Sequence, residues 1–243
     1  MRSNNTATGL TETTLNLSRG KILTRLIMIL VLPAVILFGA SGQLNWVMAW
    51  IYVGLVFVFG VVSRIVLLKK DPELFKERIE ALDKEDVKSW DKVLVPIVAV
   101  WGPMVILLVA GLDKRFGWPP QLSMWLQLAA LLVTILAYAF GQWALNTNRF
   151  FSALVRIQKD RGHTVITTGP YHYVRHPGYT ASVIAGFGVP LLLGSVWGLV
   201  PAAVVVLFFI VRTALEDKTL QSELDGYAAY AQQVRYRLVP GIW

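Results

Sequence analysis

The three histidines of the chain, His163, His172 and His176, lie within fourteen residues. The last two belong to the polar stretch TGPYHYVRHPGY, residues 168–179, which also contains Arg175 and directly precedes an apolar run. Histidine exchanges protons near neutral pH, and arginine binds anions through paired N–H donors. A cationic cluster of this kind at the edge of apolar segments predicts a site for binding or chemistry.

A second polar group, Arg212, Glu216 and Asp217, stands where another apolar run ends. Arg212 and Glu216 are four residues apart, so on a helix they would share one face and form an ion pair. Pro177 suits the first turn of a helix, which places His176 near the N-cap beside the positive end of the helix dipole. This arrangement is typical of a site for an anion such as a cofactor carboxylate. The plainer alternative is that Arg212 and Glu216 only terminate the apolar run.

Other common kinds of site are disfavoured. His172 and His176 have the four-residue spacing of a helical metal site, but Arg175 lies beside them, so we expect no metal. Gly186 and Gly188 lie inside an apolar run without the third glycine of a dinucleotide-binding turn. The chain has no cysteine, which excludes disulfides and thiolate metal sites.

The composition indicates an integral membrane protein, because 55% of the 243 residues are hydrophobic and only 16% are charged. Four apolar runs have about the 20 residues that a membrane-spanning helix needs. Two shorter runs are separated only by Gly194 and Ser195, which predicts a tight hairpin whose arms barely span, or a re-entrant hairpin. The six runs are 22–40, 46–68, 93–112, 122–145, 179–193 and 196–211. We therefore predict an all-α polytopic membrane helix bundle of about six membrane helices.

Lysine and arginine predict the orientation, because segments rich in them stay cytoplasmic. Twenty-one of the 23 lie in the N-terminal segment, between the second and third spans, around the histidine cluster or after the hairpin, and only Lys114 and Arg115 lie on the other side. We expect both termini and the histidine cluster to be cytoplasmic. The net charge of +8 then reflects contact with anionic lipid, and nucleic acid is not an expected partner.

The polar segments predict further elements. Residues 71–90 have apolar side chains at helical spacing among charged ones, which predicts a cytoplasmic amphipathic helix, or alternatively a lid. Residues 220–234 carry an apolar helical stripe with a break at Asp225 and Gly226, which predicts a C-terminal cytoplasmic helix. We expect residues 1–20 to be mobile and the first apolar run to be an uncleaved span, because some twenty polar residues precede it.

Several motifs together resemble the isoprenylcysteine carboxyl methyltransferase family and, more loosely, membrane phospholipid methyltransferases. They are RFFS at 149–152, His163, GPYHYVRHPGY at 169–179, RxxxED at 212–217 and the final YRLVPGIW. The resemblance covers residues 146–243, which we take as a methyltransferase-like catalytic region after a four-helix membrane region, 21–145. Two positions depart from the family pattern, with Ala181 in place of a glycine and Asp217 in place of a second glutamate.

The resemblance implies S-adenosylmethionine as the methyl donor and a lipophilic acceptor that enters from the bilayer, with a prenylcysteine-like carboxylate preferred. It implies that Glu216, Arg212 and Arg175 act in catalysis, with Arg212 orienting Glu216. The expected cofactor-binding residues are His163, Gly169, Tyr171, Arg175, His176, Tyr179 and Glu216. Three alternatives stay open: a phospholipid amine methyltransferase, in which Glu216 would accept a proton, an NADPH-dependent membrane reductase of the sterol type, and a non-catalytic scaffold.

Overall fold

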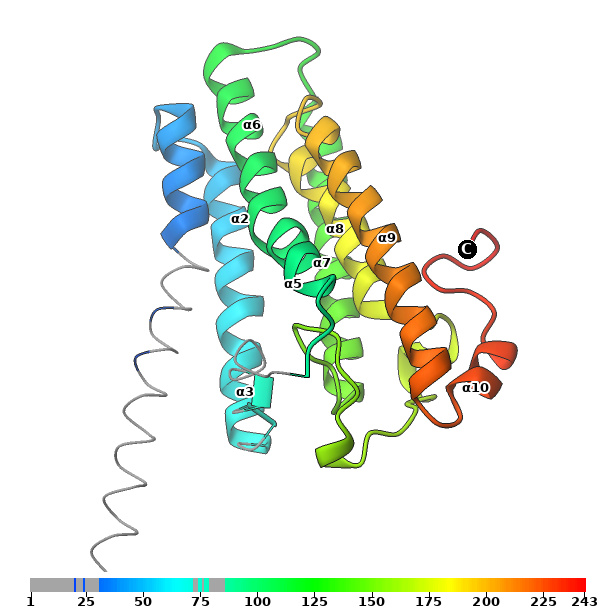
Figure 1. Ribbon diagram of the computed structural model, residues 1–243. Helices are drawn as coiled ribbons and strands as arrows, with labels where there is room; N and C mark the ends of the chain where they lie inside the picture. The colour runs from blue at the N-terminus through cyan, green and yellow to red at the C-terminus, as the bar shows by residue number, and fades with distance from the viewer. Residues whose placement is uncertain (1–19, 21–23, 25–30, 72–73, 76, 79–85) are drawn as a thin grey trace, which may run out of the picture.

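The computed structural model describes residues 20, 24, 31–71, 74–75, 77–78 and 86–243. Every regular element within these ranges is a helix, which confirms the predicted all-α class. Four described helices are long and apolar enough to cross a membrane, over residues 47–69, 91–116, 124–147 and 199–223, and two shorter apolar helices accompany them. These findings agree with the predicted polytopic bundle (Figure 1).

Two of the long helices contain π-helical turns. The first consists of α2 (Val47–Phe57), the π turn η1 (Val58–Val62) and α3 (Ser63–Lys70). The second consists of α5 (Asp91–Pro96), the π turn η3 (Ile97–Trp101) and α6 (Gly102–Phe116). Pro96 lacks the N–H that would continue the regular hydrogen-bond ladder, and the helix widens into the π turn directly after it.

The remaining elements carry the candidate site. They are α7 (Met124–Thr147), the short 3₁₀ turns η4 (Lys159–Arg161) and η5 (Gly169–His172), α8 (Pro177–Leu192), α9 (Leu199–Glu223) and α10 (Tyr227–Gln233). The predicted hairpin is present, since α8 and α9 pack together around Gly194, whose φ of 82° requires glycine. The predicted C-terminal break is confirmed, because α9 ends before Gly226 and α10 follows.

The prediction that both hairpin arms barely span is wrong for α9. This helix has 25 residues, about 37 Å at 1.5 Å per residue, because its polar continuation from Arg212 to Glu223 stays helical. Helix α8, with 16 residues, remains short. Of the first predicted span, residue 24 and the residues from 31 onward are described, and a helix runs from Val31 to Ser41.

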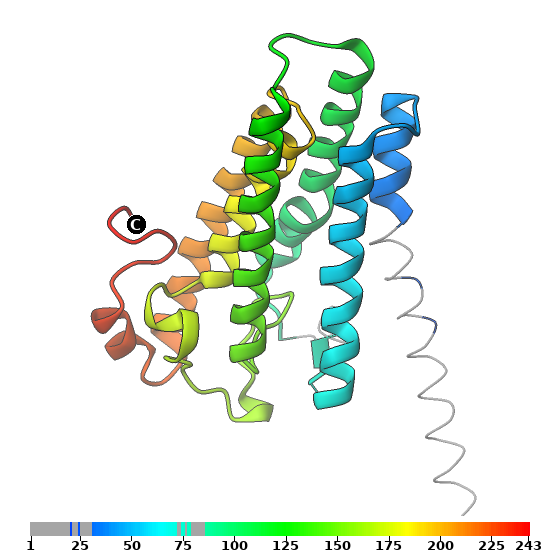
Figure 2. The same cartoon turned by 180° about the vertical axis from the view of Figure 1, so that it is seen from behind.

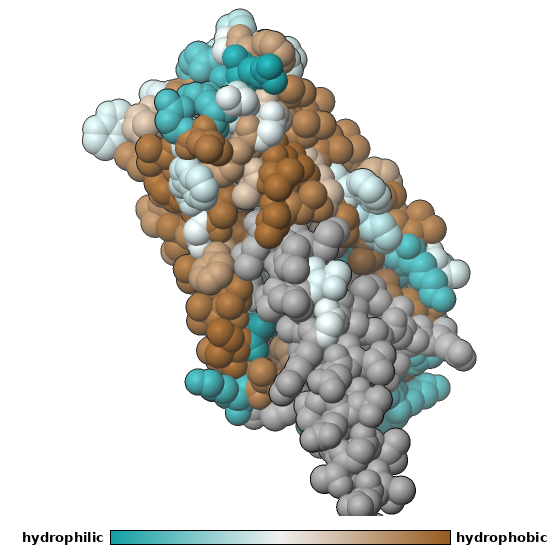
Figure 3. Space-filling view, turned by 90° about the vertical axis from the view of Figure 1, so that its left-hand side faces the viewer, coloured by the Kyte–Doolittle hydropathy of each residue, from teal (hydrophilic) through white to brown (hydrophobic). Residues whose placement is uncertain are grey.

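The connections sort into two groups at opposite ends of the bundle. The chain turns at 42–46, 117–123 and 193–198 lie at one end in Figures 1 and 2, and the loop 148–176, α10 and the end of α3 lie toward the other. The loop 148–176 and the end of α3, which carry many of the basic residues of the described chain, thus lie toward the same end. Between the ends, exposed apolar side chains such as Trp50, Phe57 and Val62 cover the surface, and Figure 3 shows this apolar band on one face.

Of the helix predicted near 71–90, residues 72–73, 76 and 79–85 lie outside the described residues. Asp71 does act at a helix start, since its Oδ1 accepts from the backbone N–H of Leu74 at 2.9 Å. Leu74 and Phe75 are helical and buried, so this part of the segment packs into the protein. The predicted mobile segment 1–20 is outside the described residues except for Gly20.

Helix α8 packs along α7 through small residues. A Cβ added to Gly188 would lie 2.4 Å from Oγ1 of Thr134, and one added to Gly141 would lie 3.0 Å from the Cβ of Ala181. Small residues let helix backbones approach closely where no hydrophobic effect drives association. The methyl group of Ala181, a departure from the family pattern, therefore contacts α7.

We predict that Gly188→Ala lowers the unfolding midpoint in detergent, because the new methyl group collides with Thr134 Oγ1. Thr134→Ala in the same chain should restore most of the loss, because the next atom of Thr134, its Cβ, is 3.5 Å away. Gly186→Ala, whose Cβ meets nothing within 4 Å, is the control. Equal midpoints for Gly188→Ala and the wild type would contradict the close α7–α8 contact.

Candidate active site

Three adjoining cavities lie where α8 and α9 meet the polar end of the bundle. The polar cavity, with an empty volume of about 770 Å³ including its mouth, lies between the loop 148–176, the start of α8, the end of α9 and α10. The apolar cavity, about 1110 Å³, lies among α5–α6, α8 and α9 and touches Tyr52 and Tyr138. The side cavity, about 860 Å³, lies between η1, α7 and α8.

The structure brings most of the predicted site residues to the polar cavity. Its walls include His163, Tyr171, Arg175, His176, Tyr179 and Glu216. The hairpin folds the start of α8 beside the end of α9, so that Nδ1 of His176 lies 4.0 Å from Oε1 of Glu216. The hydroxyl of Tyr179 donates a short hydrogen bond to Oε2 of Glu216. The two polar groups separated by forty residues in the sequence thus form one site.

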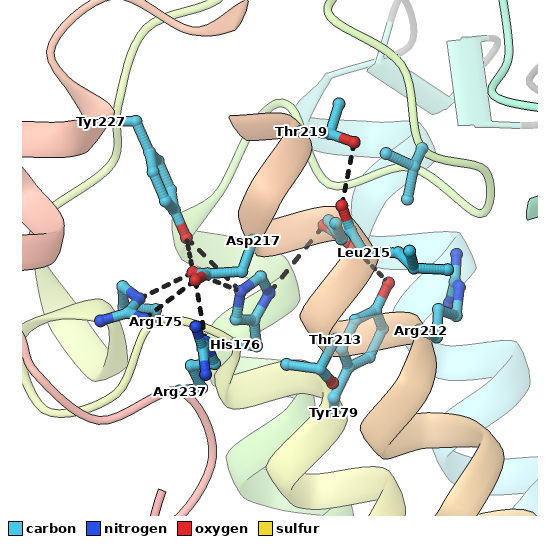
Figure 4. A network of polar contacts seen from close by, with 12 residues as sticks. Arg175, His176, Tyr179, Arg212, Thr213, Leu215, Asp217, Thr219, Tyr227 and Arg237 are labelled. Carbon is cyan, nitrogen blue, oxygen red and sulfur yellow. Dashed lines mark hydrogen bonds and ion pairs between the residues drawn. The ribbon is translucent and has the colours of Figure 1, made fainter. Parts of the chain in front are cut away.

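Asp217 is the centre of the polar network (Figure 4). Its side chain is fully buried, and Arg175 binds it with Nε at 2.8 Å from Oδ1 and Nη2 at 3.0 Å from Oδ2. The hydroxyl of Tyr227 donates to Oδ1 at 3.0 Å, Nε of Arg237 donates to Oδ2 at 2.9 Å, and Nε2 of His176 lies 3.3 Å from Oδ1. This carboxylate therefore ties α8, α9, α10 and the C-terminal tail together.

The remaining guanidinium nitrogen of Arg175, Nη1, binds the backbone of the C-terminal segment. Nη1 donates to the carbonyl oxygens of Val234 at 2.8 Å and Arg235 at 2.9 Å, and more weakly to that of Ala231 at 3.3 Å. All three guanidinium nitrogens of Arg175 thus have protein acceptors. Arg175 borders the polar cavity, but its contacts are those of a residue that holds the tail in place.

The predicted pairing of Arg212 with Glu216 is wrong. Nε and Nη2 of Arg212 donate to Oδ1 and Oδ2 of Asp91 at 2.7 and 3.0 Å, and Nη2 also donates to the carbonyl of Ala153 at 2.9 Å. Asp91 is fully buried and binds the Arg212 guanidinium through both carboxylate oxygens. This bidentate pair is stronger than the pair with Glu216 that the four-residue spacing suggested. Arg212 borders the apolar cavity, and its guanidinium carbon lies 4.9 Å from the centre of the Tyr179 ring.

Glu216 differs from its neighbour Asp217 in exposure. The Glu216 side chain is 20% exposed and faces the polar cavity, whereas that of Asp217 is 0% exposed. Glu216 is therefore the carboxylate that a ligand can reach. The rings of His176 and Tyr179 stack with an interplanar angle of 2°, which orders the wall next to it.

His163 also lines the polar cavity. Its ring lies against Phe150 with centroids 4.5 Å apart, and its Nδ1 accepts from the backbone N–H of Gln158 at 3.3 Å. Burial and, to a smaller extent, the charges of Arg156 and Arg161 together lower the pKa of His163 to about 4. The imidazole is therefore neutral at pH 7, with its Nε2 carrying the proton.

Gly169 is not brought to the polar cavity. Its φ of 60° requires glycine, and a Cβ there would lie 2.9 Å from Oγ1 of Thr147. Gly169 thus forms the turn that presents Tyr171, whose carbonyl accepts from the hydroxyl of Tyr230 at 2.6 Å. Ala181 lines the side cavity.

Two functional candidates were missed by sequence reasoning, Arg156 and Asp91. Arg156 is buried at the polar cavity and donates to Asp86 and Asp160 at 3.0 Å each and to Glu77 by a short bond. Burial alone would lower the pKa of Arg156, but its hydrogen bonds to these carboxylates raise it overall. Asp91 follows Trp90 in a region that gave no motif, and only its distant partner Arg212 reveals its role.

The part of the chain that forms the candidate site is also the part that matches known proteins. Residues 128–222 match the sequence model of the Isoprenylcysteine carboxyl methyltransferase (ICMT) family. Protein-S-isoprenylcysteine O-methyltransferase B of Arabidopsis thaliana is 31% identical over 113 residues, which cover 45% of this chain and 57% of that protein. The proteins named protein-S-isoprenylcysteine O-methyltransferase of Schizosaccharomyces pombe and Rattus norvegicus are 36% and 32% identical over 37% and 44% of this chain, each match covering 39% of the relative. The matches span about half or less of these relatives, and they confirm the resemblance predicted from the motifs.

We predict that Asp217→Asn destabilises the fold by a few kcal/mol, because Arg175 and Arg237 would lose their shared buried counter-charge. The unfolding midpoint in detergent should fall, and trypsin should cleave sooner at Arg235 or Arg237 in the released tail. Asp225→Asn, on the exposed turn after α9, should leave both unchanged. Wild-type behaviour of Asp217→Asn would contradict the role of this carboxylate.

We further predict a pH-dependent loss of stability that depends on His163. Its folded-state pKa of about 4 lies below the ordinary value of 6.5, so the unfolded chain binds more protons between these values. Stability should fall as the pH is lowered from 6.5 toward 4, and His163→Phe should reduce that slope. Unfolding midpoints at pH 7.5 provide the baseline, and identical slopes for both proteins would refute the neutral buried imidazole.

Proposed function

We propose that this chain, which resembles the ICMT family over its C-terminal part, is an integral membrane methyltransferase that esterifies the carboxylate of a lipophilic, prenylcysteine-like acceptor. The observation that carries the proposal is the junction of a polar cavity with an apolar one at Tyr179, with Glu216 on the polar side and Arg212 on the apolar side. A charged donor and a lipid-like acceptor need these two environments within reach of each other.

The polar cavity suits S-adenosylmethionine, which supplies an electrophilic methyl group on a positively charged sulfonium. Glu216 offers a reachable carboxylate for the donor's positive charges, and Phe150, Leu154 and Ile166 offer apolar walls for its base. Because Arg175 is fully engaged, we assign the donor carboxylate to the Nε2–H of His163 and to the backbone N–H of Gly178, which has no partner within α8.

Arg212 supports a carboxylate acceptor. Asp91 and Ala153 take up its Nε and Nη2, but Nη1 has no hydrogen-bond partner among the described residues. Nη1 is not among the buried atoms that lack a hydrogen-bond partner, so it remains accessible and can donate into the apolar cavity that Arg212 borders. A guanidinium held rigidly by Asp91 would fix one oxygen of an acceptor carboxylate and leave the other for attack.

The reaction then needs placement more than proton transfer. The acceptor oxygen forms a bond to the methyl carbon as the sulfur–carbon bond breaks, and no proton has to leave a carboxylate. Tyr179 and Glu216 form the wall between donor and acceptor, and their hydrogen bond keeps that wall fixed. Apolar surroundings weaken the hydration of the carboxylate and so favour transfer.

Among the alternatives, an amine acceptor would require Glu216 to accept a proton and would bring a cationic or bulky headgroup beside the Arg212 guanidinium. Repulsion between a cationic headgroup and the Arg212 guanidinium would oppose binding, so the carboxylate acceptor is better supported. No specific contact favours the sterol-type reductase or the scaffold.

We also propose the orientation of the chain and the route of the acceptor. The basic end of the bundle, with the polar cavity, faces the cytoplasm, from which the donor enters. The side cavity between Phe59 and Gly60 of η1 and Gly141 of α7 joins the apolar cavity through shared wall residues and supplies a route from the bilayer.

We predict that Glu216→Gln weakens donor binding and abolishes transfer of radioactive methyl groups to a small prenylcysteine acid. Arg212→Lys should keep donor binding and raise the acceptor KM on the order of tenfold to a hundredfold, because lysine cannot bind Asp91 bidentately and still reach the acceptor. Calorimetry with S-adenosylhomocysteine measures donor binding. Lys218→Gln, exposed on the same helix, is the control.

Two results would overturn the proposal. Full activity of Glu216→Gln and Arg212→Lys would remove the site assignment. Heat of binding with NADPH and none with S-adenosylhomocysteine would favour the reductase.

A further inference from the structure

Phe151 and Gly178 occupy a special place among the described residues, because these two line all three cavities. Ser152 and Tyr179 line only the polar and apolar cavities, and Ser182 only the apolar and side cavities. The Phe151 ring, where it lies against Gly178, thus stands at the border that the three cavities have in common.

The ring is packed directly on the backbone of α8. A Cβ added to Gly178 would lie 2.6 Å from Cε2 and 3.0 Å from Cζ of Phe151, distances at which one group must move. The φ of Gly178 is not positive, so glycine is needed here for space and not for backbone conformation. The position of the aromatic ring thus depends on the missing side chain at residue 178.

The backbone of Phe151 is held from both sides. Its N–H donates to the carbonyl of Asn148 at 3.1 Å, and its carbonyl accepts from Nε of Arg78 at 3.2 Å. Nη2 of Arg78 also binds the carbonyls of Leu145 and Asn148 at 2.8 and 3.2 Å, at the end of α7. With the main chain anchored, only the two side-chain torsions of Phe151 can change the width of the passage.

Ser152 provides a second sign that a ligand group belongs at this junction. Its Oγ is buried and has no hydrogen-bond partner among the described residues, yet the residue borders both the polar and the apolar cavity. A buried hydroxyl without a partner is costly. A rotation of the Ser152 side chain toward the cavities would let an oxygen of the acceptor carboxylate satisfy it. The reacting end of the acceptor would then lie beside Phe151.

We propose that Phe151, seated on Gly178, is a specificity-determining residue that limits the width of the acceptor next to its carboxylate. Acceptors with a slim group beside the carboxylate pass the ring and reach the methyl donor, and acceptors with a bulky group there are excluded. This inference rests on the proposed methyl transfer to a lipophilic carboxylate and adds which members of that class react.

The test uses Phe151→Ala, Gly178→Ala and the double variant in the full-length protein. Two prenylcysteine acids are compared, one with a free amino group and one with a bulky aromatic acyl group on that nitrogen, beside the carboxylate. Phe151→Ala should raise the kcat/KM ratio of bulky to slim acceptor on the order of tenfold or more. Gly178→Ala should lower kcat/KM for both acceptors on the order of tenfold to a hundredfold, because the displaced ring narrows the passage.

The double variant separates this mechanism from general damage. Adding Phe151→Ala to Gly178→Ala removes the ring atoms that the new methyl group meets, so acceptor kcat/KM should return close to that of Phe151→Ala alone. Calorimetry with S-adenosylhomocysteine should show unchanged donor affinity in Phe151→Ala, and it measures separately any effect of Gly178→Ala on the donor contact assigned to the Gly178 N–H. Gly54→Ala on α2, where a Cβ meets nothing within 4 Å, is the matched glycine control.

An unchanged ratio of bulky to slim acceptor in Phe151→Ala, or no recovery in the double variant, overturns the inference. If the wild type methylates no lipophilic carboxylate, the proposed function itself fails. Binding of a prenylcysteine acid that keeps its free amino group and carries a fluorescent label at the far end of its lipid chain, measured without donor, then still tests the passage, because Gly178→Ala should weaken it and the double variant restore it. Equal affinity in all variants would refute the role of Phe151 independently of catalysis.

Discussion

The structure depends on one buried carboxylate, Asp217, and on the cations that converge on it. Arg175 from the start of α8 and Arg237 from the tail share this charge at hydrogen-bond distance, and Tyr227 of α10 adds a third donor. Removal of charges from water is costly, so the arrangement is stable only while every member is present. This constraint fixes the polar end of a bundle whose other contacts are weakly directional apolar ones.

The adjacent carboxylates Glu216 and Asp217 have opposite tasks because successive helical residues point to different sides. Asp217 faces α8 and the tail, and all its contacts hold the fold together. Glu216 faces the polar cavity, and among the described residues its side chain accepts a hydrogen bond from Tyr179 alone. The arginines divide in the same way. Arg175 is saturated by protein acceptors, whereas Arg212, anchored by Asp91, has a nitrogen, Nη1, without a hydrogen-bond partner among the described residues.

This geometry places a polar cavity and an apolar cavity side by side in one membrane protein. The polar cavity and the apolar cavity share Phe151, Ser152, Gly178 and Tyr179. Under the proposed function, a water-soluble donor and a lipid-soluble acceptor would meet across this wall. The shortness of α8 contributes, because a helix that begins at Pro177 places its N-terminal turn at that wall.

The sequence by itself determined the helical class, the apolar spans and the hairpin at Gly194, because apolar length and glycine act locally along the chain. It also predicted the candidate site residues from charge and spacing. It did not determine which charges pair. Arg212 has Glu216 four residues away but binds Asp91, 121 positions distant in the chain. Only the tertiary structure decides such pairs, and the three-cavity junction at Phe151, because burial and distance between separate helices select the partner and sequence spacing does not report them.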